Sequence, residues 1–248
     1  MKISVITATW NSENTILDTI KSLRGQSYSN IEYIVIDGGS TDNTMKIIEQ
    51  NKDIVDYAIS ERDAGIYDAL NKGIAASSGD VLGFLHSDDI FAHRDVLRSV
   101  ATAFSENKSD SVYGDLNYVA KNDTSRIVRK WRSGAFSREN MGNGWMPPHP
   151  TFYMKRALYK EHGFFDLNFK IAADYDSILR YLWKHRVTTA YIPEVLINMR
   201  VGGESNRSLK NIINKTREDV QAMKLNDLPI VRAILGKNFS KIPQFFVR

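Results

Sequence analysis

Two short, largely apolar runs that end in acidic residues constrain the fold of this chain most strongly. The first, residues 31–36, stops at Asp37, and the second, residues 81–85, stops at a segment containing Asp88 and Asp89. Runs of this length between turn signals are typical of buried strands in a parallel sheet. In an open α/β sheet, ligands bind in the crevice at the carboxyl ends of the strands. Carboxylates at that edge can hold a ribose, a base or a metal ion.

The order of the other apolar patterns predicts an α/β fold. A strand at residues 3–8 precedes a helix that places Ile16, Ile20 and Leu23 on one face. We expect further strands at residues 57–60, 111–119, 126–131, 151–154 and 188–192, and helices around Ile47, at 69–76, 96–104 and 174–185 and from 209 onward. Alternating strands and helices indicate a parallel sheet, and no linker divides the chain into two domains.

Composition limits both compartment and metal chemistry. The chain has 248 residues, 42% of them hydrophobic, and no cysteine. Disulfides and thiolate metal sites are therefore impossible, and a metal would need oxygen or imidazole ligands. The first apolar run is too short for a signal peptide, and no stretch approaches the roughly 20 apolar residues of a membrane span. We expect a soluble cytoplasmic protein, or one bound peripherally to the inner face of the membrane.

Positive charge is concentrated at the C-terminus. Residues 205–248 carry nine Lys or Arg and three Asp or Glu, a net +6, whereas the whole chain has a net +4. Basic residues beside Phe and Ile in the last eleven positions suit an anionic membrane surface. The alternative is a helix that covers the core and ends in solvent. Nucleic acid is not an expected partner, because no basic stripe with interleaved aromatic residues crosses the strand ends.

The residues at the two strand ends leave several uses open. Gly38 and Gly39 follow a strand, but their spacing fits neither a dinucleotide fingerprint nor a phosphate-binding loop. Asp37 can accept hydrogen bonds from a base or ribose, or it can cap its own turn. Asp88 and Asp89 have the oxygen chemistry that Mg²⁺ or Mn²⁺ needs, with a diphosphate as natural co-ligand, although adjacent acids also often cap helices.

Three ordered segments together resemble family 2 glycosyltransferases of the GT-A fold. They are residues 37–44 (DGGSTDNT), 60–75 (SERDAGIYDALNKGIA) and 84–89 (FLHSDD), and a looser likeness continues to Gly203. The resemblance implies a mostly parallel, Rossmann-like sheet flanked by helices in one catalytic domain, residues 1–204. Residues 1–115 would bind the nucleotide-sugar, residues 116–204 would face the acceptor, and residues 205–248 would form a basic helical extension.

The resemblance also assigns a donor pocket. Asp37 would meet the nucleotide base, helped by residues at the exit of the first strand. The full set of implied donor-binding residues is Thr7, Thr9, Asn11, Asp37, Asp63, Lys72, Ser87 and Asp88.

The family's Asp-x-Asp motif corresponds here to Ser87-Asp88-Asp89, with serine in place of the first acid. The resemblance implies that Asp88 lies near the ribose and diphosphate and that Asp89 holds Mn²⁺ or Mg²⁺. His149 lies in a segment similar to one that reaches the donor site in relatives. It is a candidate metal ligand or acceptor contact.

Asp174 matches the acid that precedes the acceptor-side helix in the family and acts as catalytic base. Ala173 stands where the family more often has Glu. The alternative is that Asp174 only caps the helix, and hydrogen bonds from backbone N–H groups would then lower its pKa and weaken it as a base. A Gly-Gly-x-Ser segment at residues 202–205 is similar to a mobile loop that closes over the donor, or it is a solvated turn.

The activity implied by the resemblance is inverting transfer of a sugar from a nucleotide-diphospho-sugar, UDP-linked by expectation. The acceptor would be a glycan or a lipid-diphosphate-linked sugar, as in enzymes of O-antigen or colanic-acid type that build bacterial surface polysaccharides and lipopolysaccharide. Two alternatives remain. A sugar-1-phosphate nucleotidyltransferase would need a Gly- and Arg-containing N-terminal loop, which residues 7–12 lack. A non-catalytic nucleotide-binding module would need only Asp37 and the sheet.

Overall fold

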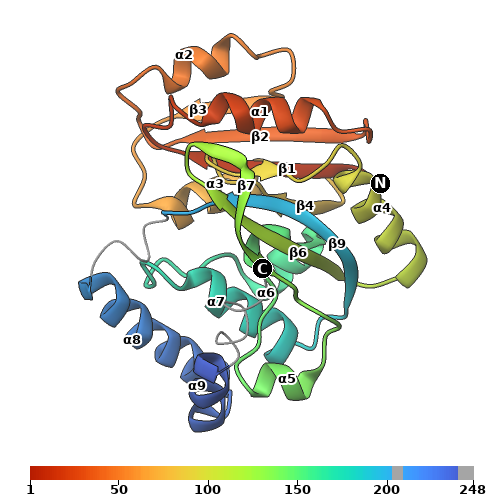
Figure 1. Ribbon diagram of the computed structural model, residues 1–248, viewed down its shortest axis with the longest axis vertical. Coiled ribbons are helices and arrows are strands. Elements are labelled where there is room, and N and C mark those ends of the chain that lie inside the picture. The colour runs from red at the N-terminus through yellow and green to blue at the C-terminus, as the bar shows by residue number, and fades with distance from the viewer. Residues whose placement is uncertain (203–208, 240–248) are drawn as a thin grey trace.

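The computed structural model describes residues 1–202 and 209–239. These residues form one central sheet with helices on both faces (Figure 1). The described strands follow the order β3-β2-β1-β4-β8-β6-β9-β5, and β7 pairs with β6. The α/β architecture predicted from the sequence is confirmed.

One half of the sheet is parallel. Its strands are β1 (Ile3–Thr9), β2 (Ile31–Asp37), β3 (Tyr57–Ser60) and β4 (Val81–Phe84). Side chains alternate along β1, so that Ile3 and Val5 enter one core while Ile6 and Ala8 enter the other. Parallel pairing brings the carboxyl ends of these strands to the same edge. The predicted site residues at the strand ends therefore meet there.

The other half of the sheet is mixed. Its strands are β8 (Tyr153–Lys155), β6 (Ser111–Ala120), β7 (Asp123–Trp131), β9 (Thr189–Arg200) and β5 (Ile90–Phe91). β8 runs antiparallel to β4 and β6, while β6 and β9 are parallel. β6 and β7 are antiparallel because the short turn between them cannot make a parallel crossover. The expected parallel pairing thus holds in the first half and becomes mixed beyond β4.

Helices cover the two faces separately. On one face lie α1 (Ile16–Arg24), α2 (Thr44–Glu49) and α4 (Val96–Asn107). On the other lie α3 (Ile66–Ala76), α6 (Arg156–His162), α7 (Ala173–Ile178) with the π-helical turn Leu179–Lys184 that follows it, α8 (Leu209–Leu225) and α9 (Ile230–Phe239). The short α5 (Arg138–Gly142) and a 3₁₀ turn at His149–Thr151 lie in the connection between β7 and β8.

Helix α3 lies very close to the sheet because Gly73 faces β1. A Cβ atom at Gly73 would lie 2.4 Å from Cγ2 of Ile6. The helix begins at Ile66, three residues earlier than the sequence pattern predicts, directly after Gly65 with its φ of +120°. A left-handed φ of this kind favours glycine. This sharp entry places residues 61–65 over the carboxyl ends of the parallel strands.

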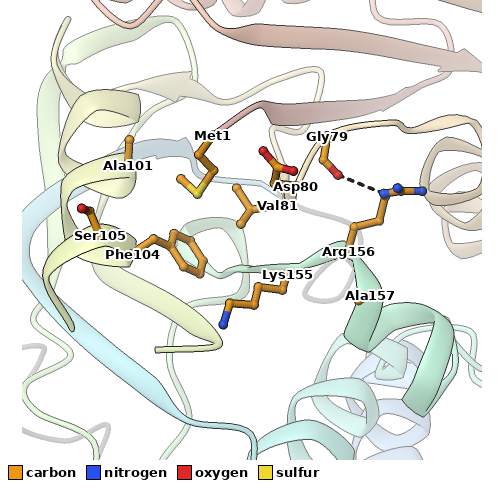
Figure 2. A pocket seen from close by; sticks show the side chains of 10 residues that line it. All are labelled: Met1, Gly79, Asp80, Val81, Ala101, Phe104, Ser105, Lys155, Arg156 and Ala157. Atoms are coloured by element: carbon orange, nitrogen blue, oxygen red, sulfur yellow. Dashed lines mark hydrogen bonds between the residues drawn. The ribbon is translucent and has the colours of Figure 1, made fainter. Parts of the chain in front are cut away.

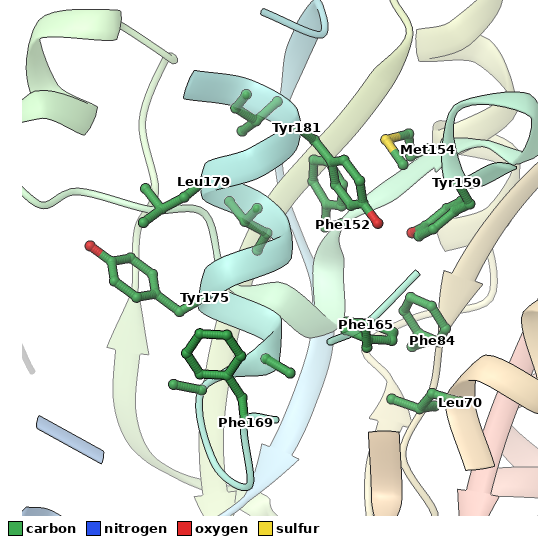
Figure 3. Close-up of a cluster of buried hydrophobic side chains, with 14 of the residues drawn as sticks. Leu70, Phe84, Phe152, Met154, Tyr159, Phe165, Phe169, Tyr175, Leu179 and Tyr181 are labelled. Carbon is green, nitrogen blue, oxygen red and sulfur yellow. The ribbon is translucent and has the colours of Figure 1, made fainter. Parts of the chain in front are cut away.

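The C-terminal helices pack on the core. Ala222, Met223 and Ala233 are fully buried and join the same hydrophobic cluster as Tyr175 and Leu179 of the α7 region. Figure 3 shows this cluster, with Phe169, Tyr175 and Leu179 around α7. The predicted boundary between residues 204 and 205, the Gly-Gly-x-Ser loop from Gly203 onward and the tail at 240–248 lie outside the described residues. None of the helices in the described part is long and apolar enough to cross a membrane.

Candidate functional site

The exits of β1 and β2 are joined by hydrogen bonds at the edge predicted to bind a donor. Thr9 pairs with Asp37, and Asp37 pairs with Ser60 of β3. Asn11 adopts a left-handed φ of +47°, which asparagine tolerates better than most residues. Its backbone N–H donates to Oγ of Ser40 at 2.8 Å, and its side-chain oxygen accepts from the N–H of Thr41 at 2.9 Å. Asn11 therefore connects the loop after β1 to the loop after β2.

Asp37 is fully buried and both of its oxygens serve the loop that follows it. Oδ2 accepts from the N–H groups of Gly39 and Ser40 at 3.1 and 2.9 Å and from the hydroxyl of Ser60. Oδ1 accepts from the hydroxyl of Ser40. The sequence allowed two roles for Asp37, recognition of a base or ribose and stabilisation of its own turn, and these hydrogen bonds are of the second kind. Asp37 thus holds the shape of the edge from beneath.

A second carboxylate, that of Asp63, lies over the same loop. A Cβ atom at Gly38 would lie 2.7 Å from Oδ2 of Asp63, so a larger residue there would displace this carboxylate. Oδ1 of Asp63 accepts from the N–H of Gly65 at 2.9 Å. Asp63 is half-buried, so its carboxylate lies nearer to solvent than that of Asp37. It is well placed to meet a ligand at this edge.

Lys72 of α3 lies beside this loop. Its Nζ is 2.7 Å from Glu61 and 3.7 Å from Asp68. The hydrogen bond to Glu61 and the surrounding acids raise its pKa, so the side chain is charged at neutral pH. The predicted pair Asp63 and Lys72 is therefore brought to one place.

The structure separates the two predicted threonines of β1. Thr7 is 0% exposed, and its hydroxyl donates to the carbonyl of Leu85 at 2.6 Å and accepts from the hydroxyl of Tyr33. Its hydroxyl is therefore engaged inside the sheet, and a donor-binding role for Thr7 stays a prediction. Thr9 is also buried, but its hydroxyl has no hydrogen-bond partner among the described residues. A buried hydroxyl without a partner is unusual in a folded protein, and this one lies at the strand end.

Ser87 and Asp88 lie in the turn after β4. The hydroxyl of Ser87 lies 2.9 Å from that of Ser12. The carbonyl of Asp88 accepts a hydrogen bond of 2.6 Å from the guanidinium of Arg200, the last residue of β9. The same guanidinium binds the carboxylate of Asp18 on α1 and the carbonyl of Lys121. Arg200 thus fixes the turn that carries the two acids.

Asp89 is 1% exposed, and its carboxylate is incompletely satisfied. Oδ1 accepts only a 3.3 Å hydrogen bond from the N–H of Arg200, and Oδ2 has no partner within the described part of the chain. Burial raises the pKa of Asp89 well above its usual range, and the charge of Asp88 adds to this. A buried carboxylate with an unpaired oxygen is costly, and a bound cation would relieve that cost. Asp89 therefore fits the predicted metal-ligand role.

His149 is engaged on both sides of its ring. Its Nδ1 lies 3.0 Å from Oδ2 of Asp174, and its Nε2 lies 3.2 Å from Nε2 of His86. Neither ring nitrogen is free in this arrangement, and a metal-binding role for His149 stays a prediction. No group of three or more His, Asp or Glu side chains suited to a metal occurs in residues 1–202 and 209–239. The remaining ligands at Asp89 would have to be substrate phosphates and water, as is usual for Mg²⁺.

Asp174 lies at the start of α7 and is held from two sides. His149 binds its Oδ2, and the hydroxyl of Tyr67 on α3 reaches its Oδ1 at 3.3 Å. Burial alone would raise the pKa of Asp174, but the charge and hydrogen bond of His149 outweigh it and hold the pKa below its usual range. Asp174 is thus ionised at neutral pH and can accept a proton, although as a weakened base.

His86, which immediately precedes Ser87, completes a chain of three side chains with His149 and Asp174. Burial, and then the charge of His149, lower the pKa of His86 to about 3, so this ring is neutral at pH 7. When His149 is neutral and donates from Nδ1 to Asp174, its bare Nε2 accepts a hydrogen bond from the Nε2–H group of His86. The chain therefore links the acid-bearing turn after β4 to Asp174.

Sequence reasoning missed two residues of this site. His86 and Tyr67 carry no local signal, because their partners His149 and Asp174 lie far away in the chain. Trp10 belongs to the exit of the first strand that the sequence had already indicated, and the structure leaves its side chain 66% exposed directly after β1. It could stack on a base or a sugar.

A cavity of about 550 Å³ lies elsewhere, at the amino end of β4 (Figure 2). Its lining includes Val81, Phe104, Lys155 and Arg156. Lys155 is paired with Asp110, and Arg156 donates to the carbonyl of Gly79. None of the predicted site residues lines this cavity, so the candidate site remains at the opposite edge.

Comparison with known proteins gives matches over most of the chain. The family model described as "Glycosyl transferase family 2" matches residues 4–171. An uncharacterized glycosyltransferase of Mycobacterium tuberculosis is 37% identical over 183 residues, which cover 72% of this chain and 68% of the relative.

Two solved structures share the fold at low sequence identity. S. aureus TarS, residues 1–349 in complex with UDP-GlcNAc, has a TM-score of 0.67 at 20% identity, covering 99% of this chain and 72% of that one. The chain spans 43% of the longer TarS structure. The mannosyltransferase PcManGT of Pyrobaculum calidifontis, in complex with GDP-Man and Mn²⁺, has a TM-score of 0.69 at 17% identity, covering 98% of this chain and 72% of that one.

Proposed function

The chain belongs to glycosyltransferase family 2 and has the GT-A fold, and from this membership we propose that it is an inverting hexosyltransferase that uses a nucleotide-diphospho-sugar. The observation that carries the proposal is the position of Asp174. Its ionised carboxylate, oriented by His149 and Tyr67, is connected through His86 to the turn that bears Asp88 and Asp89. A base and a diphosphate-binding segment joined in this way suit transfer between a donor and an acceptor hydroxyl.

In the proposed reaction, Asp174 accepts the proton of an acceptor hydroxyl as that oxygen attacks the anomeric carbon of the donor sugar. The bond from the anomeric carbon to the diphosphate breaks on the opposite face, so the configuration inverts. Because the pKa of Asp174 is low, its carboxylate can remove the proton efficiently only late in the reaction, when the forming bond to the anomeric carbon has made the acceptor hydroxyl more acidic. Asp174 must therefore be held accurately, and His149 and Tyr67 supply that restraint.

We propose UDP as the nucleotide, supported by the UDP-GlcNAc complex of TarS. Asp63 and the unpaired hydroxyl of Thr9 would contact the nucleoside, while exposed Trp10 would stack on it. Asp37 and Asn11 would keep the edge in shape. Asp88 would lie beside the ribose and diphosphate.

We propose Mn²⁺ or Mg²⁺ as cofactor, held by Asp89, whose Oδ2 has no partner among the described residues. The Mn²⁺ in the PcManGT structure supports this choice. When bound, such an ion would neutralise charge on the leaving diphosphate.

The acceptor half of the proposal is a glycan or a lipid-diphosphate-linked sugar of bacterial surface-polysaccharide assembly. We propose one catalytic domain up to residue 204 with residues 205–248 as its extension, acting in the cytoplasm or peripherally on the membrane. The buried side chains of Ala222, Met223 and Ala233 support a packing role for the extension up to α9.

A donor screen tests the proposal directly. Purified protein would be heated with UDP-, GDP- and dTDP-sugars, with and without Mn²⁺, and the melting temperature recorded. One nucleotide-sugar should stabilise the protein strongly in the presence of Mn²⁺, and slow release of UDP from it should follow. Release of pyrophosphate from a nucleoside triphosphate and a sugar phosphate would instead support nucleotidyl transfer. Binding of a donor without any turnover, even with lipid-linked acceptors, would support a non-catalytic module.

A further inference from the structure

A carboxylate from α8 binds the backbone immediately before the proposed base. Oε2 of Glu218 accepts from the N–H groups of Ile171 and Ala172 at 2.8 and 2.9 Å. The N–H of Lys170 lies 3.1 Å from both Oε1 and Oε2. One side chain thus satisfies three consecutive backbone donors. Such charge-assisted hydrogen bonds are stronger than those between neutral groups.

These three donors lie immediately before the first turn of α7. Ala172 is the N-cap residue of α7, and its side chain makes no capping hydrogen bond. The carboxylate that binds the approach to the helix comes instead from a different helix, 46 residues further along the chain than Ala172.

The same segment is held from its other side by α3. The hydroxyl of Tyr67 donates to the carbonyl of Ile171 at 2.7 Å and also reaches Oδ1 of Asp174 at 3.3 Å. Glu218 therefore holds the N–H side of residues 170–172, while Tyr67 holds the carbonyl side. Asp174 follows two residues later, so its carboxylate moves whenever this clamped segment moves.

Helix α8 contacts the α7 region at further points, and Figure 1 shows the two helices side by side. The side-chain amide of Asn226 donates to Asp176 at 2.8 Å, and both side chains are buried. Lys215, one turn before Glu218, adds a positive charge that contributes, after His149, to the lowered pKa of Asp174. Several side chains of α8 and of the turn after it thus converge on the helix that carries the base.

We propose that Glu218 is a positioning residue for Asp174, fixing the start of α7 so that the carboxylate of Asp174 stays between His149 and Tyr67. The inference rests on the proposed role of Asp174 as base. Under this proposal, α8 contributes to catalysis by keeping Asp174 in position. Sugar transfer by residues 1–204 without α8 would then be slow even where the donor still binds.

The first test compares Glu218→Ala and Glu218→Gln with Glu106→Gln, a control at an exposed position of α4. Glu218→Ala should lower kcat by about 10- to 100-fold, the usual cost of a misplaced reactive group, with the donor KM within about twofold. Glu218→Gln should be intermediate, because its amide oxygen can accept two of the N–H groups while its NH₂ opposes the third. An unchanged kcat in both folded variants, or a loss confined to KM, would overturn the proposal.

The second test does not depend on activity. Hydrogen exchange should show loss of protection at the amides of Lys170, Ile171 and Ala172 in Glu218→Ala and a smaller loss in Glu218→Gln, with the β1 and β2 amides unchanged. Unchanged protection at residues 170–172 overturns the contact itself. If the wild-type protein transfers no sugar from any donor, the proposed function fails, and the exchange result still decides whether Glu218 holds the segment. Should Glu218→Ala not fold, Glu218→Gln carries both measurements.

Discussion

Nδ1 of His149 lies 3.0 Å from Oδ2 of Asp174, and this pair connects the acceptor side of the site to the donor side. The other ring nitrogen of His149 faces His86, which directly precedes the Ser87-Asp88-Asp89 turn. The imidazole therefore does two things. It stabilises the ionised form of the proposed base, and it couples the position of that base to the segment expected to hold the diphosphate.

Replacing His149 by Gln should shift the pH dependence of turnover. The ionised form of Asp174 is the active one, so activity falls as the pH falls through its pKa. Because His149 lowers that pKa and burial opposes it, the variant should lose activity at a pH about one unit or more higher than wild type. kcat measured from pH 4 to 8 at saturating donor checks this. Wild type should show no acidic limb in this range, because the pKa of Asp174 lies well below it, whereas His149→Gln should lose activity toward pH 4. His185→Gln, in the stacked pair with His162, is the control. A His149→Gln variant that is as active at pH 4 as at pH 8 would contradict the assignment of Asp174 as base.

Replacing Asp89 by Asn should stabilise the metal-free protein at high pH. The pKa of Asp89 is higher in the folded than in the unfolded state, so its ionisation costs stability as the pH rises above the unfolded value. The melting temperature of the variant should equal that of wild type at pH 4 and should be about 2 to 4 °C higher at pH 8. Mn²⁺ with UDP should raise the melting temperature of wild type and not of Asp89→Asn. Glu106→Gln, at an exposed position of α4, is the control. Full stabilisation of Asp89→Asn by Mn²⁺ and UDP would rule out Asp89 as the ligand.

Valine substitutions at Thr7 and Thr9 should have opposite effects. Thr7→Val removes a buried hydroxyl from the carbonyl of Leu85 and should cost about 1 kcal/mol of unfolding free energy or more, without changing donor affinity. Thr9→Val removes a hydroxyl that has no partner in the described structure. It should keep its stability and raise the donor KM several-fold. Urea unfolding and donor titration of both variants distinguish these effects. Equal loss of donor affinity in both would support a donor-binding role for Thr7.

Gly38→Ala should weaken donor binding through Asp63. The new methyl group would lie 2.7 Å from Oδ2 of Asp63 and force that carboxylate to move. We expect donor affinity to fall about 5- to 10-fold, near 1 kcal/mol, with a smaller change in kcat. Calorimetric titration with UDP measures this. Gly25→Ala, where a Cβ would meet its nearest atom at 3.5 Å, is the matched control and should bind normally. Normal UDP binding by Gly38→Ala would remove Asp63 from the donor site.

The hydrophobic pattern of the sequence predicted the parallel half of the sheet, in which each buried strand pairs in parallel with its neighbours. The runs at residues 31–36 and 81–85 became β2 and β4, and the acids after them lie at one edge, because hydrophobic runs and turn residues determine strand ends locally. The mixed half was less predictable. β9 extends to Arg200, well beyond residue 192, because its pairing with β6 outweighs weak local patterning.

Side-chain roles depended on contacts that no local pattern encodes. Thr7 and Thr9 look alike in the sequence, and the hydrogen bonds of the Thr7 hydroxyl with Leu85 and Tyr33 distinguish them. His149 was predicted to bind metal or acceptor, but the fold brings it to Asp174. Glu218 reads as an ordinary polar residue of an amphipathic helix until α8 packs against α7.

The cross-link made by Arg200 bears on the order in which the nascent protein matures. Its guanidinium joins Asp18, the carbonyl of Asp88 and the carbonyl of Lys121, three points spread over the first half of the polypeptide. β5, which follows the turn with Asp88 and Asp89, also depends on this late segment, because it pairs with β9. During synthesis on a ribosome, domains assemble from the N-terminus as the chain emerges. The turn with Asp88 and Asp89 would gain its contacts with Arg200 only after residue 200 has left the exit tunnel. A partly synthesised chain would therefore lack the final structure of this turn.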